Sequence, residues 1–141
     1  MLISTFIILG LVTLSILIHY EALLRLSMVM KHIHILPRLR IVIGLVGALT
    51  AHVLEVLVFA FAYYFLGKSE QYGELVGSVS GTLSDCIYFS FSSYTSLGFG
   101  DIIPMGTLRY VAGVEALLGL VLIAWTASFM YVEMQRFWKV P

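Results

Sequence analysis

Charged residues are scarce in this 141-residue chain, which has eight lysines and arginines and eight aspartates and glutamates, together 11% of the sequence. A soluble domain has roughly 25% charged residues, so this composition excludes an ordinary globular protein in water. The mean hydropathy of +1.00 and the hydrophobic content of 60% indicate an integral membrane protein. The length leaves no room for a second folded domain.

Other features that the sequence lacks narrow the function further. A single cysteine, Cys86, excludes an intrachain disulfide. The formal net charge is zero, so nothing indicates nucleic-acid binding. The sequence contains no phosphate-binding loop, metal-ligand spacing or nucleophile–base arrangement, which argues against an enzyme and against a cofactor. No segment has arginines at every third position, so a voltage sensor is also excluded.

Three apolar segments reach the roughly 20 residues that a helix needs to cross a bilayer. The first runs from about residue 2 to 18 and is expected to continue as a helix to 26. The second runs from about 41 to 66 and the third from about 108 to 132. A fourth segment, 84–95, is too short to span. It follows a predicted N-cap at Thr82 or Ser84 and has Asp85 in its first turn. We therefore predict an all-α membrane protein with three transmembrane helices and a re-entrant helix.

The distribution of basic residues predicts the topology. Six of the eight follow the first or the third apolar segment: Arg25, Lys31, Arg38, Arg40, Arg136 and Lys139. The positive-inside rule assigns that side to the cytoplasm, so we expect a multi-pass plasma (inner) membrane protein with its N-terminus outside and its C-terminus inside. The basic linker, 31–40, is also a candidate for binding anionic lipid head groups.

The first segment, 1–30, has two interpretations. It lacks the basic start and the small-residue cleavage site of a signal peptide, so we expect an additional transmembrane helix rather than a cleaved leader. Small residues on the second segment would allow it to pack closely: Gly44, Gly47, Ala48 and Ala51. No sensor domain is expected after the third segment, because only a short tail remains.

The most informative motif lies between the re-entrant segment and the third span. Residues 95–101 read Thr-Ser-Leu-Gly-Phe-Gly-Asp. Gly98 and Gly100 allow backbone φ values that other residues avoid, and successive carbonyl oxygens can then face one line. A row of carbonyls of this kind can replace the hydration shell of a cation, as four Thr-Val-Gly-Tyr-Gly loops do in potassium channels.

Over about residues 40–135 the chain resembles the bacterial two-transmembrane potassium channel family, on the motif 95–101 with Pro104 and Gly119. The resemblance implies a pore domain at 41–135, made of an outer helix, pore helix, selectivity filter and inner helix, that conducts K⁺ passively. It assigns the filter to Thr95, Ser96, Leu97, Gly98, Phe99 and Gly100. The K⁺ ions would bind to the carbonyls of Ser96, Leu97, Gly98 and Phe99, and Asp101, Tyr88 and Ser92 would support the filter.

One chain supplies one pore loop, and the sequence has no internal repeat, so the resemblance implies a homotetramer. The filter departs from the family pattern, because Ser96 replaces threonine, Leu97 replaces valine or isoleucine, and Phe99 replaces tyrosine. Two alternatives to a K⁺-selective channel therefore stay open. One is a weakly selective monovalent cation channel, and the other is a non-conducting pore-like subunit.

Ionisable residues inside the spans are functional candidates because they are costly in lipid. His52 and Glu55 are three residues apart on one helix and can pair, and Glu115 lies on the third span, behind the filter or facing the cavity. These three have either a gating role or a packing role, and Gly119 either permits bending or allows close packing. Three histidines fall near the linker, where protonation near neutral pH is a further hypothesis: His19, His32 and His34.

Overall fold

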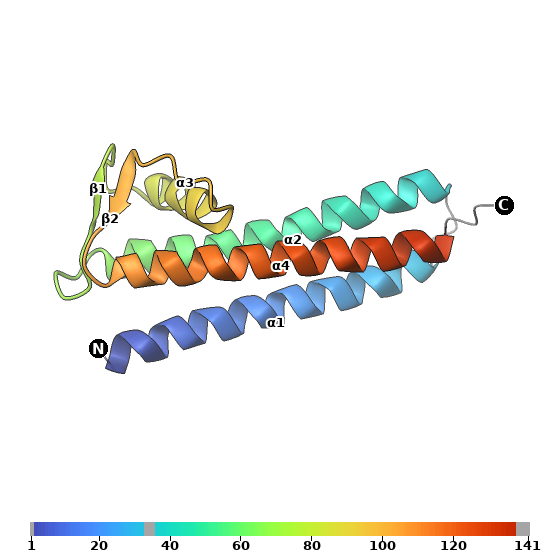
Figure 1. Ribbon diagram of the computed structural model, residues 1–141, viewed down its shortest axis with the longest axis horizontal. Coiled ribbons are helices and arrows are strands. Elements are labelled where there is room, and N and C mark those ends of the chain that lie inside the picture. The colour runs from blue at the N-terminus through green and yellow to red at the C-terminus, as the bar shows by residue number, and fades with distance from the viewer. Residues whose placement is uncertain (1, 33–35, 138–141) are drawn as a thin grey trace.

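The protein forms a bundle of three long helices with a short helix and two short strands at one end (Figure 1). The computed structural model describes residues 2–32 and 36–137. In chain order the elements are α1 (Leu2–His32), α2 (Pro37–Leu66), β1 (Leu75–Gly77), α3 (Leu83–Tyr94), β2 (Ile102–Pro104) and α4 (Leu108–Phe137). The helices α1, α2 and α4 are each long and apolar enough to cross a membrane, which confirms the three predicted spans.

The long helices extend beyond the segments that hydropathy indicated. Helix α1 continues to His32, and α2 begins at Pro37, where proline is favoured because its fixed φ suits the first turn and its missing N–H is not needed there. The linker is therefore shorter than the predicted 31–40, since both ends of that range are helical. His34 and Lys139 lie outside the described residues.

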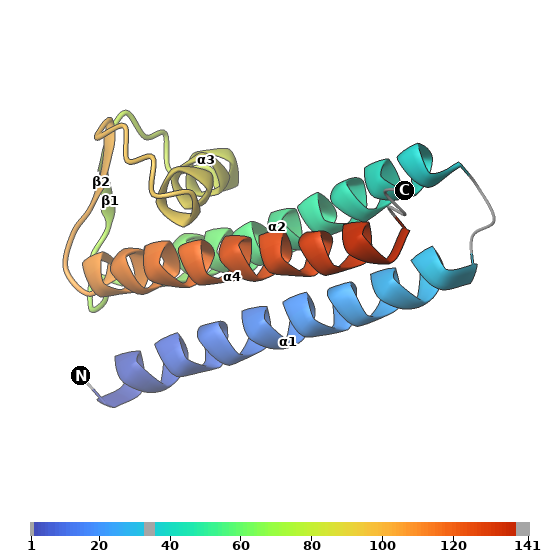
Figure 2. The same ribbon diagram turned by 45° about the vertical axis from the view of Figure 1, so that its right-hand side comes forward.

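Helix α1 packs along α2 and α4, away from α3 (Figure 2). The contact uses the small residues of α2, as predicted. A Cβ added to Gly47 would lie 2.7 Å from Leu26 Cδ1, and one added to Gly44 would lie 3.1 Å from Met30 Sδ. Ala48 and Ala51 are also buried. Because lipid tails are as apolar as these side chains, close packing rather than exclusion of water stabilises the contact.

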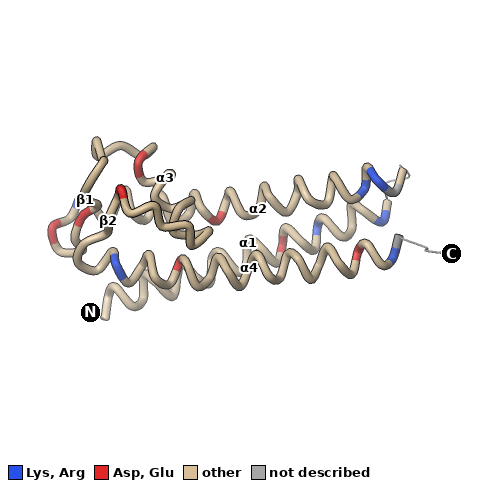
Figure 3. Tube along the Cα trace, turned by 45° about the horizontal axis from the view of Figure 1, so that its top comes forward, with Lys and Arg blue, Asp and Glu red and all other residues tan. Residues whose placement is uncertain are grey.

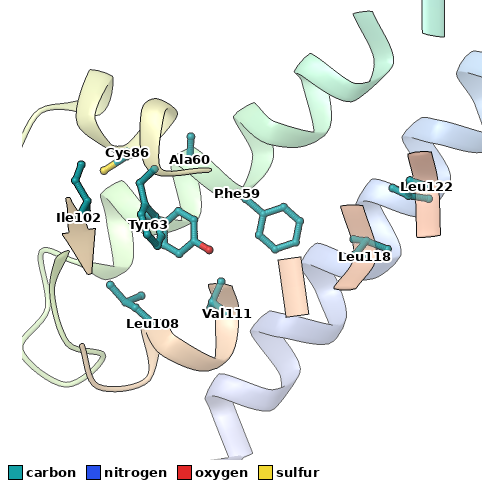
Figure 4. Packing of buried hydrophobic residues seen from close by; sticks show 10 residues of the cluster. Phe59, Ala60, Tyr63, Cys86, Ile102, Leu108, Val111, Leu118 and Leu122 are labelled. Atoms are coloured by element: carbon teal, nitrogen blue, oxygen red, sulfur yellow. The ribbon is translucent and has the colours of Figure 1, made fainter. Parts of the chain in front are cut away.

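Helix α3 is held against α2 and α4 by a cluster of buried apolar side chains (Figure 4). Tyr63 of α2 lies in this cluster with Cys86 of α3 and Leu108 of α4, and its ring meets Phe89 edge to face at a centroid distance of 4.9 Å. Phe89 is itself buried. The short helix is thus enclosed by protein on this side, as non-spanning backbone at membrane depth requires.

Two short elements are not helical, unlike the rest of the predicted all-α fold. Strands β1 and β2 pair antiparallel, with Val76 opposite Ile103 and Gly77 opposite Ile102. β-branched residues favour this extended backbone. Gly77 has φ of 114°, and a Cβ there would lie 2.2 Å from the carbonyl oxygen of Asp101. The pair therefore ties the chain before α3 to the chain that follows residues 95–101.

Charges divide between the two ends of the bundle (Figure 3). Basic residues gather where α1 meets α2 and where α4 ends, whereas the end that carries α3, β1 and β2 has most of the acidic residues. The motif 95–101 therefore lies at the end opposite the basic residues, and the described N-terminal part of α1 lies at the same end as the strands (Figure 1).

Candidate functional site

The start of α3 is fixed by a capping box. The Thr82 hydroxyl accepts a hydrogen bond from the Asp85 N–H at 3.3 Å, and the Asp85 carboxylate accepts from the Thr82 N–H at 3.0 Å. The N–H of Ser80 donates to the same carboxylate at 2.8 Å. These hydrogen bonds hold the pKa of Asp85 below its ordinary value. Of the two predicted N-caps, Thr82 is the one used.

Replacing Asp85 with alanine should lower the Tm of the purified protein, because two backbone N–H groups lose their acceptor. The folded-state pKa of Asp85 is depressed, so its stabilisation is present above the unfolded pKa of about 3.9 and is lost as the pH falls through the folded-state value. The Tm difference between wild type and Asp85→Ala should therefore shrink in acid. The control is thermal unfolding of Glu70→Ala, which removes an exposed carboxylate of the neighbouring loop. Equal Tm values for wild type, Asp85→Ala and Glu70→Ala would contradict the prediction.

After α3 the chain folds back so that its amide groups face the helix it has just left. The N–H groups of Leu97 and Gly98 donate to the Ser92 carbonyl at 2.9 and 3.3 Å, and that of Ser96 donates to the Ser93 carbonyl at 2.9 Å. The Phe99 N–H donates to the Ser92 hydroxyl at 3.4 Å. Four consecutive N–H groups thus point toward α3. In a planar trans peptide the carbonyl of the preceding residue points the opposite way, so the carbonyls of Thr95, Ser96, Leu97 and Gly98 face away from α3.

The backbone conformation of this segment alternates. Ser96, Gly98 and Gly100 have φ of 57°, 56° and 80°, whereas neither Leu97 nor Phe99 between them has positive φ. In an ordinary strand successive carbonyls point to opposite sides, and inverting every second residue turns them toward the same side. Two of the three left-handed positions are glycine, which reaches this region at no steric cost. Ser96 is the exception, and sequence reasoning did not foresee its conformation.

Tyr88 of α3 contacts the segment through its ring. Its ring stacks on that of Phe99 with a centroid distance of 6.3 Å and an interplanar angle of 6°. A hydrogen bond with Asp101 raises the pKa of the Tyr88 hydroxyl above its ordinary value. The three predicted supporting residues, Tyr88, Ser92 and Asp101, thus all contact the segment or each other.

The arrangement of a re-entrant helix, a glycine-containing loop and two flanking spans agrees with a comparison of the sequence with known families. The sequence model of a family described as "Ion channel" matches residues 51–136, which is more than half of the chain. The chain belongs to this ion channel family. No curated protein and no solved structure matches it significantly. The matched part of the channel begins within α2 and includes α3, the loop and most of α4, whereas α1 precedes it.

Glu115 lies behind the pore helix of the channel rather than in an open cavity. It is fully buried among α2, α3 and α4, and its carboxylate accepts hydrogen bonds of 2.5 Å from the Tyr63 and Ser90 hydroxyls. Sequence reasoning named Glu115 but missed both partners. The available signal was Tyr63, which with Tyr64 brings the last side-chain hydroxyls to the apolar end of α2. The predicted gating role of Glu115 stays a prediction.

Gly119 allows the end of α3 to approach α4. A Cβ at Gly119 would lie 2.1 Å from the carbonyl oxygen of Tyr94, a distance that backbone atoms cannot accommodate without moving. Of its two predicted roles in the channel, close packing is therefore present in the structure. A hinge at the same position stays a prediction.

The expectation for His19 is wrong. Because α1 continues to His32, His19 lies within the span and not at the linker, and its side chain is fully buried against Glu55. His52 also contacts Glu55, at 3.2 Å, as the spacing predicted. His32 is exposed near the end of α1, where its Nδ1 contacts the Met28 carbonyl. That His19 joins the His52–Glu55 pair was not predictable from helical spacing, because His19 lies on a different helix.

Proposed function

We propose that four copies of this chain assemble around a central axis and conduct K⁺ passively through a carbonyl-lined filter. The observation that carries the proposal is the conformation of residues 96–99, whose N–H groups bond back to Ser92 and Ser93 while φ alternates in sign. These N–H groups share peptide planes with the carbonyls of Thr95, Ser96, Leu97 and Gly98, which would therefore face away from α3 and toward the axis. The left-handed conformation of Gly100 would turn the Phe99 carbonyl the same way. Carbonyl oxygens in such a row substitute for the hydration shell of K⁺.

The exposure of the filter side chains supports the homotetramer. Leu97 and Phe99 are 60% and 64% exposed in the single chain, although they belong to the part of the protein that lies at membrane depth. A hollow beside them is lined by Tyr88, Phe91 and Thr95. Neighbouring copies would cover these side chains and complete the ring of carbonyls, and one chain alone provides only one side of an ion site.

The charge distribution supports an orientation in the plasma (inner) membrane. The basic end of the bundle would face the cytoplasm, so the filter mouth and the N-terminus would face outward. Arg25, Lys31, Arg38 and Arg40 lie near the cytoplasmic head groups in this orientation and offer charges for anionic lipids.

A weakly selective cation channel is the second candidate. Ser96 retains the hydroxyl of the threonine usual in the family but lacks its methyl, which restricts rotation of the side chain. Phe99 lacks the tyrosine hydroxyl, and the hydrogen bond that its N–H makes to Ser92 is long, at 3.4 Å. A thousandfold preference for K⁺ corresponds to about 4 kcal/mol, which a loosely held filter would not maintain. A non-conducting subunit is the third candidate.

The reversal potential distinguishes these candidates. Purified protein in a planar bilayer, with K⁺ on one side and Na⁺ on the other, should give a reversal potential near the K⁺ equilibrium value and current that Ba²⁺ blocks. A reversal potential near zero with clear current would favour the weakly selective channel. The tetrameric state of the protein is first established by cross-linking. If that tetramer then passes no current at any voltage or pH, the proposed conduction is contradicted.

A further inference from the structure

Two histidines and a glutamate converge inside the helix bundle, away from the filter. His19 of α1 and Glu55 of α2 have fully buried side chains, and that of His52 is 13% exposed. The Nδ1 atoms of His19 and His52 lie 2.8 and 3.2 Å from the two oxygens of the Glu55 carboxylate. One ligand atom from each residue lies within 4.8 Å of the other two.

The opposite edges of both imidazole rings face one hydroxyl. The Nε2 atoms of His52 and His19 lie 3.0 and 3.3 Å from Thr126 Oγ1, which belongs to α4. Tyr94, the last residue of α3, donates its hydroxyl hydrogen to Glu55 and lies 2.8 Å from His52 Nδ1. The cluster thus joins α1 to all the helices of the pore domain.

The contacts of this cluster require more hydrogens than its neutral rings supply. They are His19–Glu55, His52–Glu55, His52–Tyr94, Tyr94–Glu55, His52–Thr126 and His19–Thr126. With an ionised carboxylate, each neutral histidine and each hydroxyl brings one hydrogen, so four hydrogens serve these six contacts. The His52 Nδ1–H can be shared between Glu55 and Tyr94. Even then, one of the two contacts between an imidazole Nε2 and Thr126 Oγ1 has two lone pairs facing each other, unless an additional cation is bound.

We propose that His19, His52 and Glu55 form a binding site for a divalent transition metal of the Zn²⁺ class. Two imidazole nitrogens and one carboxylate are a ligand set that Zn²⁺ uses when it keeps a fourth position open. Tetrahedral bonds of roughly 2.0–2.2 Å place ligand atoms about 3.3 Å apart, and the two ring-to-carboxylate separations are 2.8 and 3.2 Å. The two separations involve different oxygens of Glu55, and one ligand atom from each residue lies within 4.8 Å of the other two, so the imidazole rings would have to move closer together around the carboxylate to bind the ion.

Metal binding also removes the conflict between the two imidazole rings at Thr126. With both Nδ1 atoms coordinated, both Nε2–H groups donate to the two lone pairs of Thr126 Oγ1, an outer contact of the kind that fixes ligating histidines. The Tyr94 hydroxyl continues to donate to the Glu55 carboxylate, and the carboxylate offsets one of the two charges of the ion. Both contacts between an imidazole Nε2 and Thr126 Oγ1 then contain a hydrogen.

The fourth position has a cavity beside it. A cavity of about 440 Å³ between α2, α3 and α4 is lined by His52, Tyr94 and Thr126 together with apolar side chains. This space adjoins the cluster and has room for the water that would complete the coordination of the ion. The site would connect α1 to the pore domain, and metal binding there is independent of whether the filter selects K⁺.

Direct measurement of bound metal tests the proposal. Tag-free wild-type protein in detergent, stripped with a chelator, is incubated with ZnCl₂, desalted and analysed by mass spectrometry for metal content. We expect one Zn²⁺ per chain and a higher Tm, because a ligand that binds only the folded state stabilises it. Cu²⁺ in the same protein should show electron paramagnetic resonance couplings from two imidazole nitrogens.

Variants locate the site. Glu55→Gln and His19→Gln should each weaken Zn²⁺ binding more than tenfold, and Thr126→Val should weaken it about 10- to 100-fold. His32→Gln is the matched control, since it removes an exposed histidine of the same helix and should leave binding unchanged. The proposal is overturned if wild-type protein binds no Zn²⁺, or if its bound Cu²⁺ shows no imidazole coupling. Both measurements use the wild type, so they hold whether or not the variants fold. The additional cation of the cluster would then be a proton. Full Zn²⁺ binding by folded Glu55→Gln would overturn it as well.

Discussion

Replacing Gly119 with alanine should destabilise the channel strongly. The new methyl group would lie 2.1 Å from the Tyr94 carbonyl oxygen, and a backbone atom has no alternative rotamer with which to avoid it. Overpacking of this kind costs about 1–3 kcal/mol, and the displaced residue is the last of α3, directly before the proposed filter. We expect a lower Tm in detergent and a smaller fraction of conducting channels.

The matched control is Gly113→Ala on the same helix. A Cβ at Gly113 meets no atom of the chain within 4 Å, and alanine favours a helix by about 1 kcal/mol over glycine, so its Tm should be unchanged or higher. If Gly119→Ala melts like wild type but changes the open probability in single-channel records, the packing explanation fails and a hinge at Gly119 is supported.

In the proposed K⁺ channel, replacing Gly100 with alanine should remove K⁺ selectivity. Gly100 has φ of 80°, and an L-residue in the left-handed region costs roughly 1–2 kcal/mol. In a homotetramer the cost is incurred four times around one axis, so the segment is expected to relax toward negative φ and to turn a carbonyl away from the ion path. The reversal potential between K⁺ and Na⁺ should move from the K⁺ equilibrium value toward zero, or the current should vanish.

Gly81→Ala separates this effect from general backbone strain. Gly81 also has positive φ, 73°, and a methyl group added there would meet no atom within 4 Å, but it lies before α3 and outside the filter. The substitution should lower stability slightly and leave the reversal potential unchanged. Equal reversal potentials for wild type and Gly100→Ala would argue against carbonyl coordination by this loop.

Much of the architecture could be predicted because it depends on local composition. Hydropathy and length identify the three spans, and the capping pattern around Thr82 and Asp85 identifies the start of α3. The pairing of His52 with Glu55 follows from helical spacing alone. These features need no knowledge of how the helices pack against one another.

Features that depend on contacts between distant segments were not predictable. Strands of three residues have too little periodicity to be recognised, and β1 finds its partner only because α3 returns the chain to the same end. The position of His19 within the bundle depends on where α1 ends. Hydropathy predicted an apolar segment that ends at about residue 18, whereas α1 continues to His32. The partners of Glu115 depend on how α2 and α3 are rotated about their axes, which a single sequence does not specify.

The pairing of β1 with β2 has a consequence for assembly. It closes the segment from Ser78 to Asp101 into a loop whose two ends are hydrogen-bonded within one chain. The conformational entropy lost in bringing these ends together is therefore lost during folding of the monomer. In the proposed tetramer, subunit association has only to align four loops that are already closed, so the rate of assembly should depend on encounter between subunits and not on ordering of the filter.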